Sequence, residues 1–377
     1  MHGPQKDVWW TQSTRFNKMS RTRIGILTSG GDCPGLNAVI TAASRCAEKR
    51  DWDLLGFCDG FEGLISGTPP RLLSRKETSG IMHTGGTILG TVNRGHFISR
   101  RGPRNASFIP AEIIGKTRRT FEEFSLLGLI VVGGDGSLNT ALQLYQAGLP
   151  VVGVPKTIDN DLEATAMTFG FDSAVECVGS ALDRLHTTAS SHKRIMILEA
   201  MGRHAGWIAL HGGVAGGADM ILIPEIPFDF DKIIAEVERR DNEGAACTMI
   251  VAAEGATPRS GRQIRHRSAS GDKRLGGISD VIAREISERT GRDVRSCVLG
   301  HLQRGGAPTM TDRILATCFG VRAVELVAEG KFGTMVSHKN HCTVDAPLAD
   351  AVQRMRKVNP DSHLVQAARS VGISFGD

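Results

Sequence analysis

One local pattern occurs twice in this sequence and constrains the fold more than any other feature. Residues 23–28 form a short apolar run, residues 29–37 are rich in glycine and polar side chains, and residues 38–49 have the period of a helix. The same order of strand, glycine loop and helix recurs over residues 126–147, with its glycines within 133–137. This order is typical of α/β proteins with parallel sheets.

Further short apolar runs alternate with helical segments along the chain. We expect strands at residues 151–154, 194–198, 220–223, 248–252 and 296–299. Parallel sheets of this kind carry helices on both faces, and ligands bind at the carboxyl ends of their strands. The polar loops therefore mark the candidate site, and a length of 377 residues suits two domains or one large α/β unit.

Composition limits the classes of function. The eight cysteines lack metal-ligand spacing, no apolar run approaches the roughly 20 residues of a membrane span, and the N-terminus lacks the apolar core of a secretory signal. We therefore expect reduced thiols, no membrane partner and a cytoplasmic location. The net charge of +5 comes from dispersed basic residues, and the chain has one tyrosine, so we expect an anionic small molecule as partner and no nucleic acid.

Both glycine loops suit phosphate. A glycine loop between a strand and a helix lets backbone N–H groups approach phosphate oxygens at the positive end of the helix. A tight turn with positive φ would also select glycine, so one loop alone is weak evidence. Two loops, each with an aspartate, favour a phosphate site, and Asp135 stands where a carboxylate can hold Mg²⁺ against donor phosphates.

The segment 155–161 is the most specific feature. Asp159 and Asp161 follow a short strand, so one carboxylate can accept a proton from a hydroxyl while the other lies near a metal or orients the loop. The same residues also suit a helix cap or a turn. Asp135 lies 24 positions before Asp159, and neighbouring strands would bring both loops to one edge of the sheet.

Several arginines stand in polar, glycine-containing segments. A kinase with an anionic acceptor needs cations to hold it, and a guanidinium group binds phosphate at two points. Any single arginine also fits a solvated surface position, and their recurrence at strand ends is what favours a site. The candidates are Arg194, Arg203, Arg295, Arg304 and the nearby His301.

With these residues identified, the sequence resembles the phosphofructokinase family. The blocks that carry the resemblance occur in the order of the family, and the similarity runs from about Arg23 to the end of the chain. They are residues 29–37, 133–137, 155–162, 168–174, 201–203, 299–306 and 312–316. One half-length unit is present in place of the fused double unit of some animal members.

The resemblance implies an α/β fold of two similar Rossmann-like domains with mostly parallel sheets and the active site in the cleft between them. The expected parts are a poorly ordered extension over 1–22, a nucleotide-binding domain from 23–170 plus 304–360, and a sugar-phosphate-binding domain from 171–303 plus 361–377. The resemblance also implies a homo-oligomer, a dimer or a tetramer, in which Arg194 and Arg295 reach the site of a neighbouring subunit.

The resemblance assigns roles to individual residues. It implies Asp159 as the general base, Thr157 beside the acceptor hydroxyl and Arg203 as a cation that offsets charge. The donor site would contain Gly30, Arg94, Asp135, Gly136 and Ser137, and the metal ligands would be Asp135 and Asp161. The fructose 6-phosphate site would contain Thr157, Asp159, Arg194, Met201, Gly202, Arg203, Glu254, Arg295, His301 and Arg304. The implied cofactors are Mg²⁺ and, as co-substrate, ATP.

Two positions of the family pattern bear on the phosphoryl donor. Pyrophosphate-dependent members usually have aspartate at the position of Gly136, where it crowds and repels the α-phosphate of a nucleotide, and they carry a lysine like Lys156. Gly136 leaves room for ATP, so we expect an ATP-dependent enzyme, with the pyrophosphate-dependent enzyme as the alternative. The family arginine that follows the Gly-Ser/Thr pair is displaced here by one position to Arg94, which leaves its role open.

Other classes of protein account for less of the chain. Lipid and NAD kinases share a Gly-Gly-Asp-Gly loop but would not need residues 155–162 or 301–306. A silent regulatory subunit would not need Asp135, Asp159 and Arg203 together. The resemblance implies transfer of the γ-phosphoryl group of Mg-ATP to the 1-hydroxyl of fructose 6-phosphate, a step of glycolysis, and this is the reaction that we expect.

Overall fold

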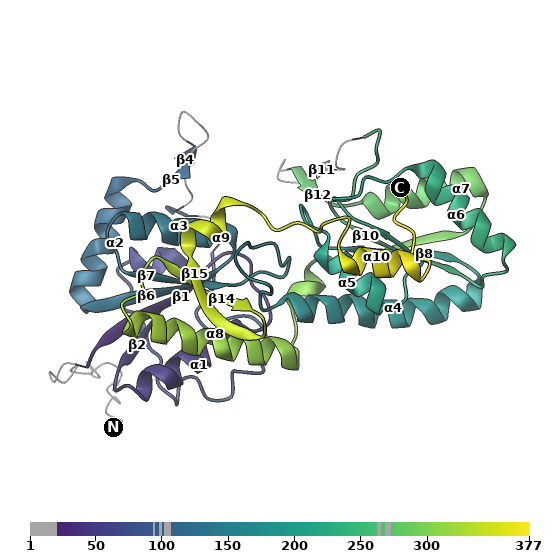
Figure 1. The fold of residues 1–377 in the computed structure, drawn as a ribbon. Coiled ribbons are helices and arrows are strands. Elements are labelled where there is room, and N and C mark those ends of the chain that lie inside the picture. The colour runs from purple at the N-terminus through teal and green to yellow at the C-terminus, as the bar shows by residue number, and fades with distance from the viewer. Residues whose placement is uncertain (1–20, 93–94, 98–99, 102–106, 262–264, 268–272) are drawn as a thin grey trace, which may run out of the picture.

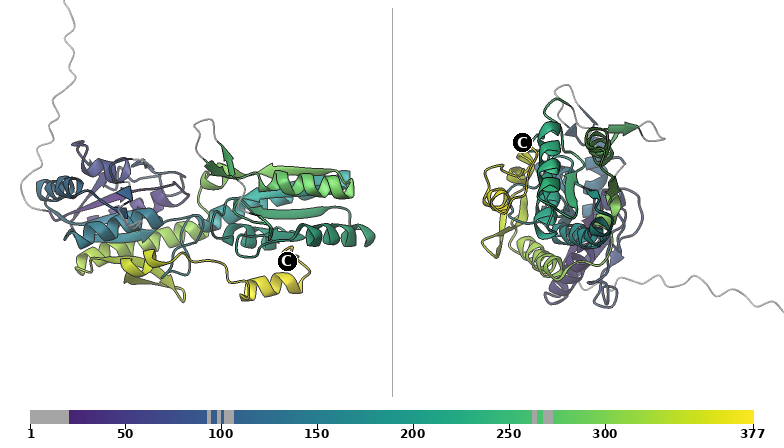
Figure 2. Two further views of the ribbon diagram at one scale, coloured as in Figure 1. Left: turned by 90° about the horizontal axis from the view of Figure 1, so that it is seen from above. Right: turned by 90° about the vertical axis from the view of Figure 1, so that its right-hand side faces the viewer.

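Two β-sheets, each covered by helices, form the described part of the protein (Figure 1). The computed structural model describes residues 21–92, 95–97, 100–101, 107–261, 265–267 and 273–377. Nearly all of the expected extension over 1–22, and Arg94 of the expected donor site, lie outside these residues. Figure 2 shows the two sheets side by side in an elongated molecule, with the C-terminal segment along one side.

The larger sheet has seven strands in the order β15-β14-β7-β6-β1-β2-β3. Its neighbours from β14 to β2 pair in parallel, while β15 and β3 pair antiparallel at the two edges. The strands are β1 (Arg23–Thr28), β2 (Asp53–Phe57), β3 (Arg71–Leu72), β6 (Leu126–Gly133), β7 (Val151–Pro155), β14 (Thr334–Lys339) and β15 (Cys342–Pro347).

The smaller sheet has four strands in the order β13-β8-β10-β9, and all neighbours pair in parallel. They are β8 (Ile195–Ala200), β9 (Met220–Leu222), β10 (Thr248–Ala253) and β13 (Val294–Val298), an edge strand. The prediction of an α/β fold with two Rossmann-like units and mostly parallel sheets is confirmed. The residue boundaries of the two domains stay a prediction.

Helices cover both faces of each sheet (Figure 1). With the larger sheet lie α1 (Leu36–Glu48), α2 (Ala111–Phe124), α3 (Asp135–Gln146), α8 (Met310–Ala328) and α9 (Leu348–Gln353). With the smaller sheet lie α4 (Phe171–His192), α5 (Trp207–Ala215), α6 (Phe230–Asn242), α7 (Ile278–Thr290) and α10 (His363–Ser370). Among the described residues, no helix is long and apolar enough to cross a membrane.

Alternate positions of β6 enter two separate cores. Ile130 and Val132 pack in the same cluster as residues of α1 and α8, while Leu129 and Val131 pack in the cluster that includes residues of α2 and α3. All four side chains are fully buried. Each such burial contributes roughly 1.5–3 kcal/mol, and a shift of one residue would exchange the two faces. The packing therefore fixes which residue ends the strand and begins the polar loop.

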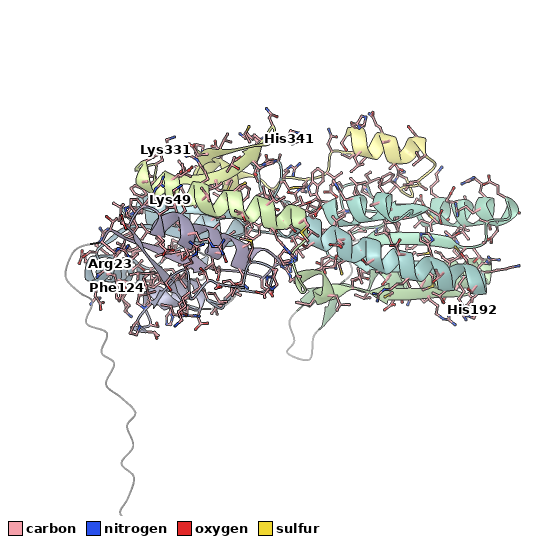
Figure 3. All side chains as sticks on the ribbon, turned by 90° about the horizontal axis from the view of Figure 1, so that it is seen from below. Arg23, Lys49, Phe124, His192, Lys331 and His341 are labelled. Atoms are coloured by element: carbon pink, nitrogen blue, oxygen red, sulfur yellow. The ribbon has the colours of Figure 1, made fainter. Side chains whose placement is uncertain are left out.

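The N-termini of α4 and α8 cap each other. Asp312 of α8 accepts hydrogen bonds from the backbone N–H (2.8 Å) and the hydroxyl (2.6 Å) of Ser173 in the first turn of α4. Thr309, the N-cap of α8, donates its hydroxyl to Asp172 of α4 (2.6 Å). These contacts fix the start of α4 against the larger unit, and the helix then runs to His192 at the far end of the molecule (Figure 3).

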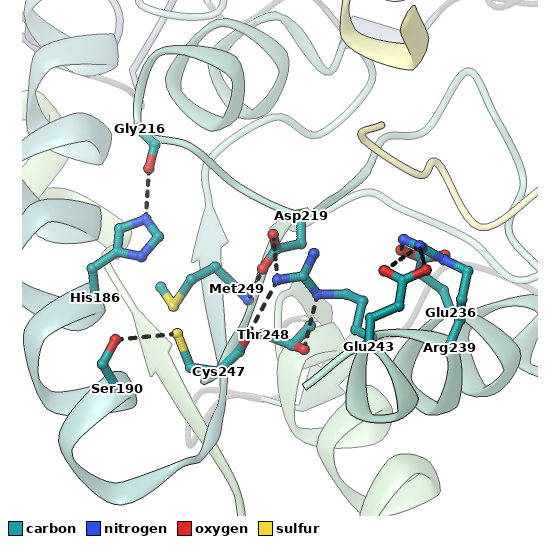
Figure 4. A network of polar contacts seen from close by, with 11 residues as sticks. His186, Ser190, Gly216, Asp219, Glu236, Arg239, Glu243, Cys247, Thr248 and Met249 are labelled. Carbon is teal, nitrogen blue, oxygen red and sulfur yellow. Dashed lines mark hydrogen bonds and ion pairs between the residues drawn. The ribbon is translucent and has the colours of Figure 1, made fainter. Parts of the chain in front are cut away.

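A network of polar contacts closes the amino-terminal edge of the smaller sheet (Figure 4). Asp219, just before β9, accepts a hydrogen bond from the backbone N–H of Met249 (2.7 Å) and pairs with Arg240 of α6 (2.8 Å). Arg240 also donates to the hydroxyl of Thr248 at the start of β10 (3.2 Å). The loops that follow β8 and β10 lie at the opposite edge of this sheet.

The structure differs from the sequence predictions at several element boundaries. Helix α3 begins at Asp135 and not at residue 138, because Gly134 is its N-cap and an acidic residue is favourable in a first turn. Helix α1 begins at Leu36, and β13 covers Val294–Val298 in place of 296–299. Strand β2 and the hairpin of β14 and β15 were not predicted.

Short elements complete the described chain. Two 3₁₀ helices, η1 (Gly60–Leu64) and η2 (Gly300–Arg304), follow strands β2 and β13. Two small hairpins pair β4 (Arg100–Arg101) with β5 (Ser107–Phe108) and β11 (Arg265–Arg267) with β12 (Lys273–Leu275). The second hairpin lies in the basic stretch 259–273, of which residues 262–264 and 268–272 are outside the described residues.

Candidate active site

A cavity of about 620 Å³ lies between the carboxyl ends of the two sheets, a size that suits a small-molecule site. The loops after β1, β6 and β7 line one side of it, and the loops after β8 and β10 line the other. The predicted site residues that line it are Gly30, Asp135, Gly136, Ser137, Lys156, Thr157, Asp159, Asp161, Met201, Arg203, Glu254 and Arg304. Residues far apart in sequence therefore meet in one cavity.

The first glycine loop is held from several directions. Gly30 has a φ of 82°, a conformation that glycine adopts without strain, and its carbonyl accepts a hydrogen bond from the hydroxyl of Thr91 (2.6 Å). Lys156 donates to the carbonyl of Gly31, and Arg304 donates to the carbonyl of Asp32 (3.1 Å). Two cations from other parts of the chain thus fix this loop at the cavity wall.

The second glycine segment is the first turn of α3. Its residues Asp135, Gly136 and Ser137 line the cavity, and the first backbone N–H groups of a helix have no partner within the helix. A Cβ atom added to Gly136 would meet no atom within 4 Å, so this position is open to the cavity. The wall combines free space, N–H donors and the positive end of the helix dipole, which together suit phosphate.

The acidic loop after β7 has a defined internal geometry. The hydroxyl of Thr157 accepts from the backbone N–H of Asp159 (3.1 Å) and donates to the carboxylate of Asp161 (3.2 Å). Asn160 between them has a φ of 50°, and its side-chain oxygen accepts from the backbone N–H of Thr168 (3.1 Å). The turn holds both carboxylates toward the cavity, which they line.

Asp159 has the acidity of a group that exchanges protons near neutral pH. Burial and the charge of Asp161 raise its pKa to about 6, while Arg304 and Arg203 act in the opposite direction. A general base works best when its pKa lies near the working pH. At pH 7 to 8 the carboxylate is mostly ionised and can accept a proton.

Two further carboxylates fit a divalent cation. Asp135 is exposed on the cavity wall, where partial loss of its water shell and the charge of Asp161 raise its pKa, and burial also raises the pKa of Asp161. Among the described residues no cluster of three His, Cys, Asp or Glu side chains forms a metal site. Mg²⁺ prefers one or two carboxylates together with phosphate oxygens and water, so this pair fits a Mg²⁺ that arrives with its phosphates.

The opposite wall comes from the smaller sheet. Met201 and Arg203 follow β8 and Glu254 follows β10, and the backbone N–H of Glu254 donates to the carbonyl of Ala200 (2.8 Å). The side chain of Gln303 in η2 accepts from the backbone N–H of Met201 (3.2 Å). These contacts place Arg203, Arg304 and Glu254 where an anionic substrate with hydroxyl groups could bind.

Four predicted substrate residues do not line the cavity of this chain. Gly202 has a φ of 145° and shapes the turn between Met201 and Arg203, and His301 is exposed on η2. Arg194 and Arg295 both pair with Asp293, each at 2.5 Å. They precede or begin β8 and β13, so they lie at the amino edge of the smaller sheet and not at its carboxyl edge.

The cavity also has an aromatic wall, in which Phe61 stands at a position that the family pattern predicts for the acceptor site, whereas its other residues were not predicted. Phe61 of η1 stacks on Phe97 with ring centroids 5.2 Å apart, and both line the cavity. Glu62 accepts hydrogen bonds from the backbone N–H (2.6 Å) and the ring Nδ1 (2.7 Å) of His96. The segment Gly60–Leu64 could have indicated this wall from the sequence, since polar loops at strand ends form sites in such folds. The strand before it, β2, was not predicted.

The fold and the cavity define an α/β protein with two mostly parallel sheets and, between them, a cavity whose glycine-containing wall suits phosphate. The sequence pattern of the phosphofructokinase family matches residues 23–327, and the chain belongs to this family.

Individual relatives extend the match. An ATP-dependent 6-phosphofructokinase of Chloroflexus aggregans is 49% identical over 95% of this chain and 98% of its own length. A pyrophosphate--fructose 6-phosphate 1-phosphotransferase of Amycolatopsis methanolica is 46% identical over 90% of this chain and 97% of its own length. A crystal structure of Pichia pastoris phosphofructokinase in the T-state is 30% identical with a TM-score of 0.76, and the match covers 94% of this chain but 37% of that longer chain.

Proposed function

We propose that this chain is an ATP-dependent 6-phosphofructokinase, which transfers the γ-phosphoryl group of ATP to the 1-hydroxyl of fructose 6-phosphate. One observation carries the proposal: the half-buried carboxylate of Asp159, with a pKa raised to about 6 by burial and by Asp161, lies in one cavity with the open first turn of α3. A base for an alcohol thus shares a space with a wall suited to phosphate. The relative named for this activity at 49% identity supports the same function.

The side chains divide the work as follows. Asp159 accepts the proton of the sugar hydroxyl while the oxygen of that hydroxyl attacks the γ-phosphorus. The bond from the γ-phosphorus to the bridging oxygen of the β-phosphate breaks, which releases ADP. The N–H groups at the start of α3 hold donor phosphate oxygens. Arg203 and Arg304 bind the anionic acceptor and offset charge that spreads over the transferred group. Asp135 and Asp161 would hold Mg²⁺, which supplies further charge neutralisation for the phosphates.

A matrix of donors and acceptors tests this function. Purified protein would be assayed with ATP or pyrophosphate against several sugar phosphates, and turnover with ATP and fructose 6-phosphate is expected. Asp159→Asn should leave both substrate affinities near normal and lower kcat by about 10²–10⁴, since it removes the general base. An Asp159→Asn enzyme as active as the wild type would remove the assigned base. Preference for pyrophosphate would favour the activity named for the Amycolatopsis relative.

We further infer that a second copy of the chain completes the acceptor site. Arg194 and Arg295 lie at the amino edge of the smaller sheet, and a strand of six residues such as β8 spans about 20 Å, so neither reaches the cavity of its own chain. Exposed apolar side chains occur further along the chain, at Val298 (54%), Leu302 (70%) and Ile314 (67%). Apolar side chains exposed to this degree suit a contact between chains.

Complementation between two impaired variants, assayed at a fructose 6-phosphate concentration well below the KM of Arg295→Ala, tests this inference. Arg295→Ala should raise the KM for fructose 6-phosphate and leave the KM for ATP unchanged, whereas Arg289→Ala, in a remote exposed ion pair with Asp231, should change neither. Mixed oligomers of Arg295→Ala and Asp159→Asn chains would contain intact sites and should regain activity. No regain in oligomers proven to contain both chains would argue against shared sites.

A cytoplasmic location fits this function. All eight cysteines are free thiols, which is typical of proteins in a reducing compartment.

A further inference from the structure

A short C-terminal segment, residues 355–358, contacts both units of the protein beside the cavity. It lies between α9 of the larger unit and α10 of the smaller unit, and Figure 1 shows the chain crossing from one to the other at this point. Met355 lines the cavity itself. The segment lies beyond residue 327, where the family pattern ends, and none of its residues was predicted to belong to the site.

The segment is bonded first to the acidic loop. Met355 pairs with Leu162 in an antiparallel bridge, and the backbone N–H of Arg356 donates to the carbonyl of Asp161 (2.8 Å). The guanidinium of Arg356 donates to the carbonyl of Ala166 (2.9 Å) and, at 3.4 Å, to that of Asn160. Arg356 therefore bonds backbone on both sides of the turn that carries Asp159 and Asp161.

The same residue is bonded to the start of α5. The guanidinium of Arg356 lies over the ring of Trp207, 4.4 Å from the centroid. The backbone carbonyl of Arg356 accepts a hydrogen bond from Trp207 Nε1 (3.0 Å). Trp207 is the first residue of α5 and follows Arg203 by four positions. Two residues further on, the backbone N–H of Val358 donates to Glu225 (2.9 Å), which also accepts from the backbone N–H of Gly206.

We propose that Arg356 is a positioning residue for phosphoryl transfer, which holds the turn of Asp159 at a fixed distance from the segment of Arg203. This inference rests on the function proposed above. Asn160 has a positive φ, which a non-glycine residue keeps only when its surroundings hold it there. The contacts of Arg356 supply that restraint on one side, and those of Thr168 supply it on the other. Arg356 touches no position assigned to substrate, so its effect is on geometry alone.

The expected consequence is a loss of turnover without a matching loss of affinity. A misplacement of reacting groups by about 1 Å can cost about 10²-fold in rate. Arg356→Met keeps most of the apolar body and removes the guanidinium, while the backbone contact to Asp161 remains. We expect kcat to fall by about 10- to 100-fold, with the KM for ATP within about twofold of wild type. Arg354→Met, an exposed arginine two positions earlier, is the matched control and should leave kcat unchanged.

Two further variants keep the test decisive. Trp207→Phe removes the N–H donor and keeps an aromatic face, and Arg356→Lys keeps a charge that can still reach a carbonyl. Both should fold even if Arg356→Met does not, and both should lower kcat less than Arg356→Met does. Restoration of part of the rate by lysine, with equal melting temperatures, would support the proposal.

The outcomes separate this inference from the function itself. Absence of activity of the wild-type protein on ATP and fructose 6-phosphate would contradict the proposed function. An active wild type together with an Arg356→Met enzyme whose kcat equals that of Arg354→Met would overturn only the role of Arg356. A fall in melting temperature with both KM values raised and kcat unchanged would also overturn it, because that pattern reports a structural role.

Discussion

Replacement of Gly136 by aspartate should weaken the use of ATP while leaving the fold intact or slightly more stable. The side chain would point into free space, since an added Cβ meets no atom within 4 Å. Aspartate in the first turn of α3 interacts favourably with the helix dipole, by about 0.3–1 kcal/mol, so the melting temperature should not fall. Stability and ATP use are therefore expected to change in opposite directions.

The loss in ATP use follows from charge and crowding. Two like charges about 5 Å apart repel by about 3 kcal/mol at an effective dielectric constant near 20, and less where water reaches them. Because Gly136 is exposed on the cavity wall, we expect about 1–3 kcal/mol, roughly a 5- to 150-fold rise in the KM for ATP. Pyrophosphate carries no nucleoside, so its relative use should increase.

Steady-state assays with both donors test this reasoning. Gly136→Asn has nearly the same size without the charge and separates crowding from repulsion. Gly115→Asp, which places the same side chain in open space on α2, controls for effects on stability. A Gly136→Asp enzyme with an unchanged KM for ATP would refute the assignment of α3 to the donor site.

Three other predictions use separate parts of the structure. Burial raises the pKa of Asp312 to about 6 from 3.8, so the native state binds this proton more tightly, and stability should fall by about 2–3 kcal/mol as the pH rises from 4 to 7. Asp312→Asn should flatten this decline in urea midpoints, and an equally steep decline would count against it. Glu62→Gln should lower kcat/KM severalfold with the melting temperature nearly unchanged, because it loosens the segment of His96 at the aromatic wall, and an unchanged kcat/KM would count against a role for this wall. Chelation of Mg²⁺ should abolish turnover without lowering the melting temperature in the absence of nucleotide, whereas residual activity in excess chelator would exclude a role for Asp135 as a metal ligand.

The sequence predicted the parts of this protein whose signal is local. The apolar period of residues 126–132 and 151–154 and the polar loops after them specify strands that end at one sheet edge, and Asp135 and Asp159 do line one cavity. The observed helix boundaries differ from the predicted ones where two local sequence preferences compete. A glycine at position 136 suggested a loop, but a helix tolerates glycine in its first turn when an N-cap and an acidic residue precede it.

The missed residues act through contacts that no local pattern encodes. Gln303 reaches the backbone of Met201, about a hundred positions earlier in the chain, and Arg356 reaches that of Asp161, which is even further away. Glu62 holds His96 across a gap of 34 positions. Glutamine, arginine and glutamate at such positions look like ordinary surface residues until the fold brings their partners beside them.

Sheet polarity separates two arginines that look alike in the sequence. Arg194 and Arg203 are nine positions apart, one on each side of β8. The strand between them is about 20 Å long, so Arg203 lines the cavity while Arg194 pairs with Asp293 at the amino edge of the same sheet. No local motion can bring Arg194 to the cavity, because the two arginines would exchange places only if the strand were reversed. If Arg194 takes part in phosphoryl transfer, it must therefore do so in the cavity of another chain. Activity in mixed oligomers distinguishes such a shared site from a site within one chain, whereas single variants do not.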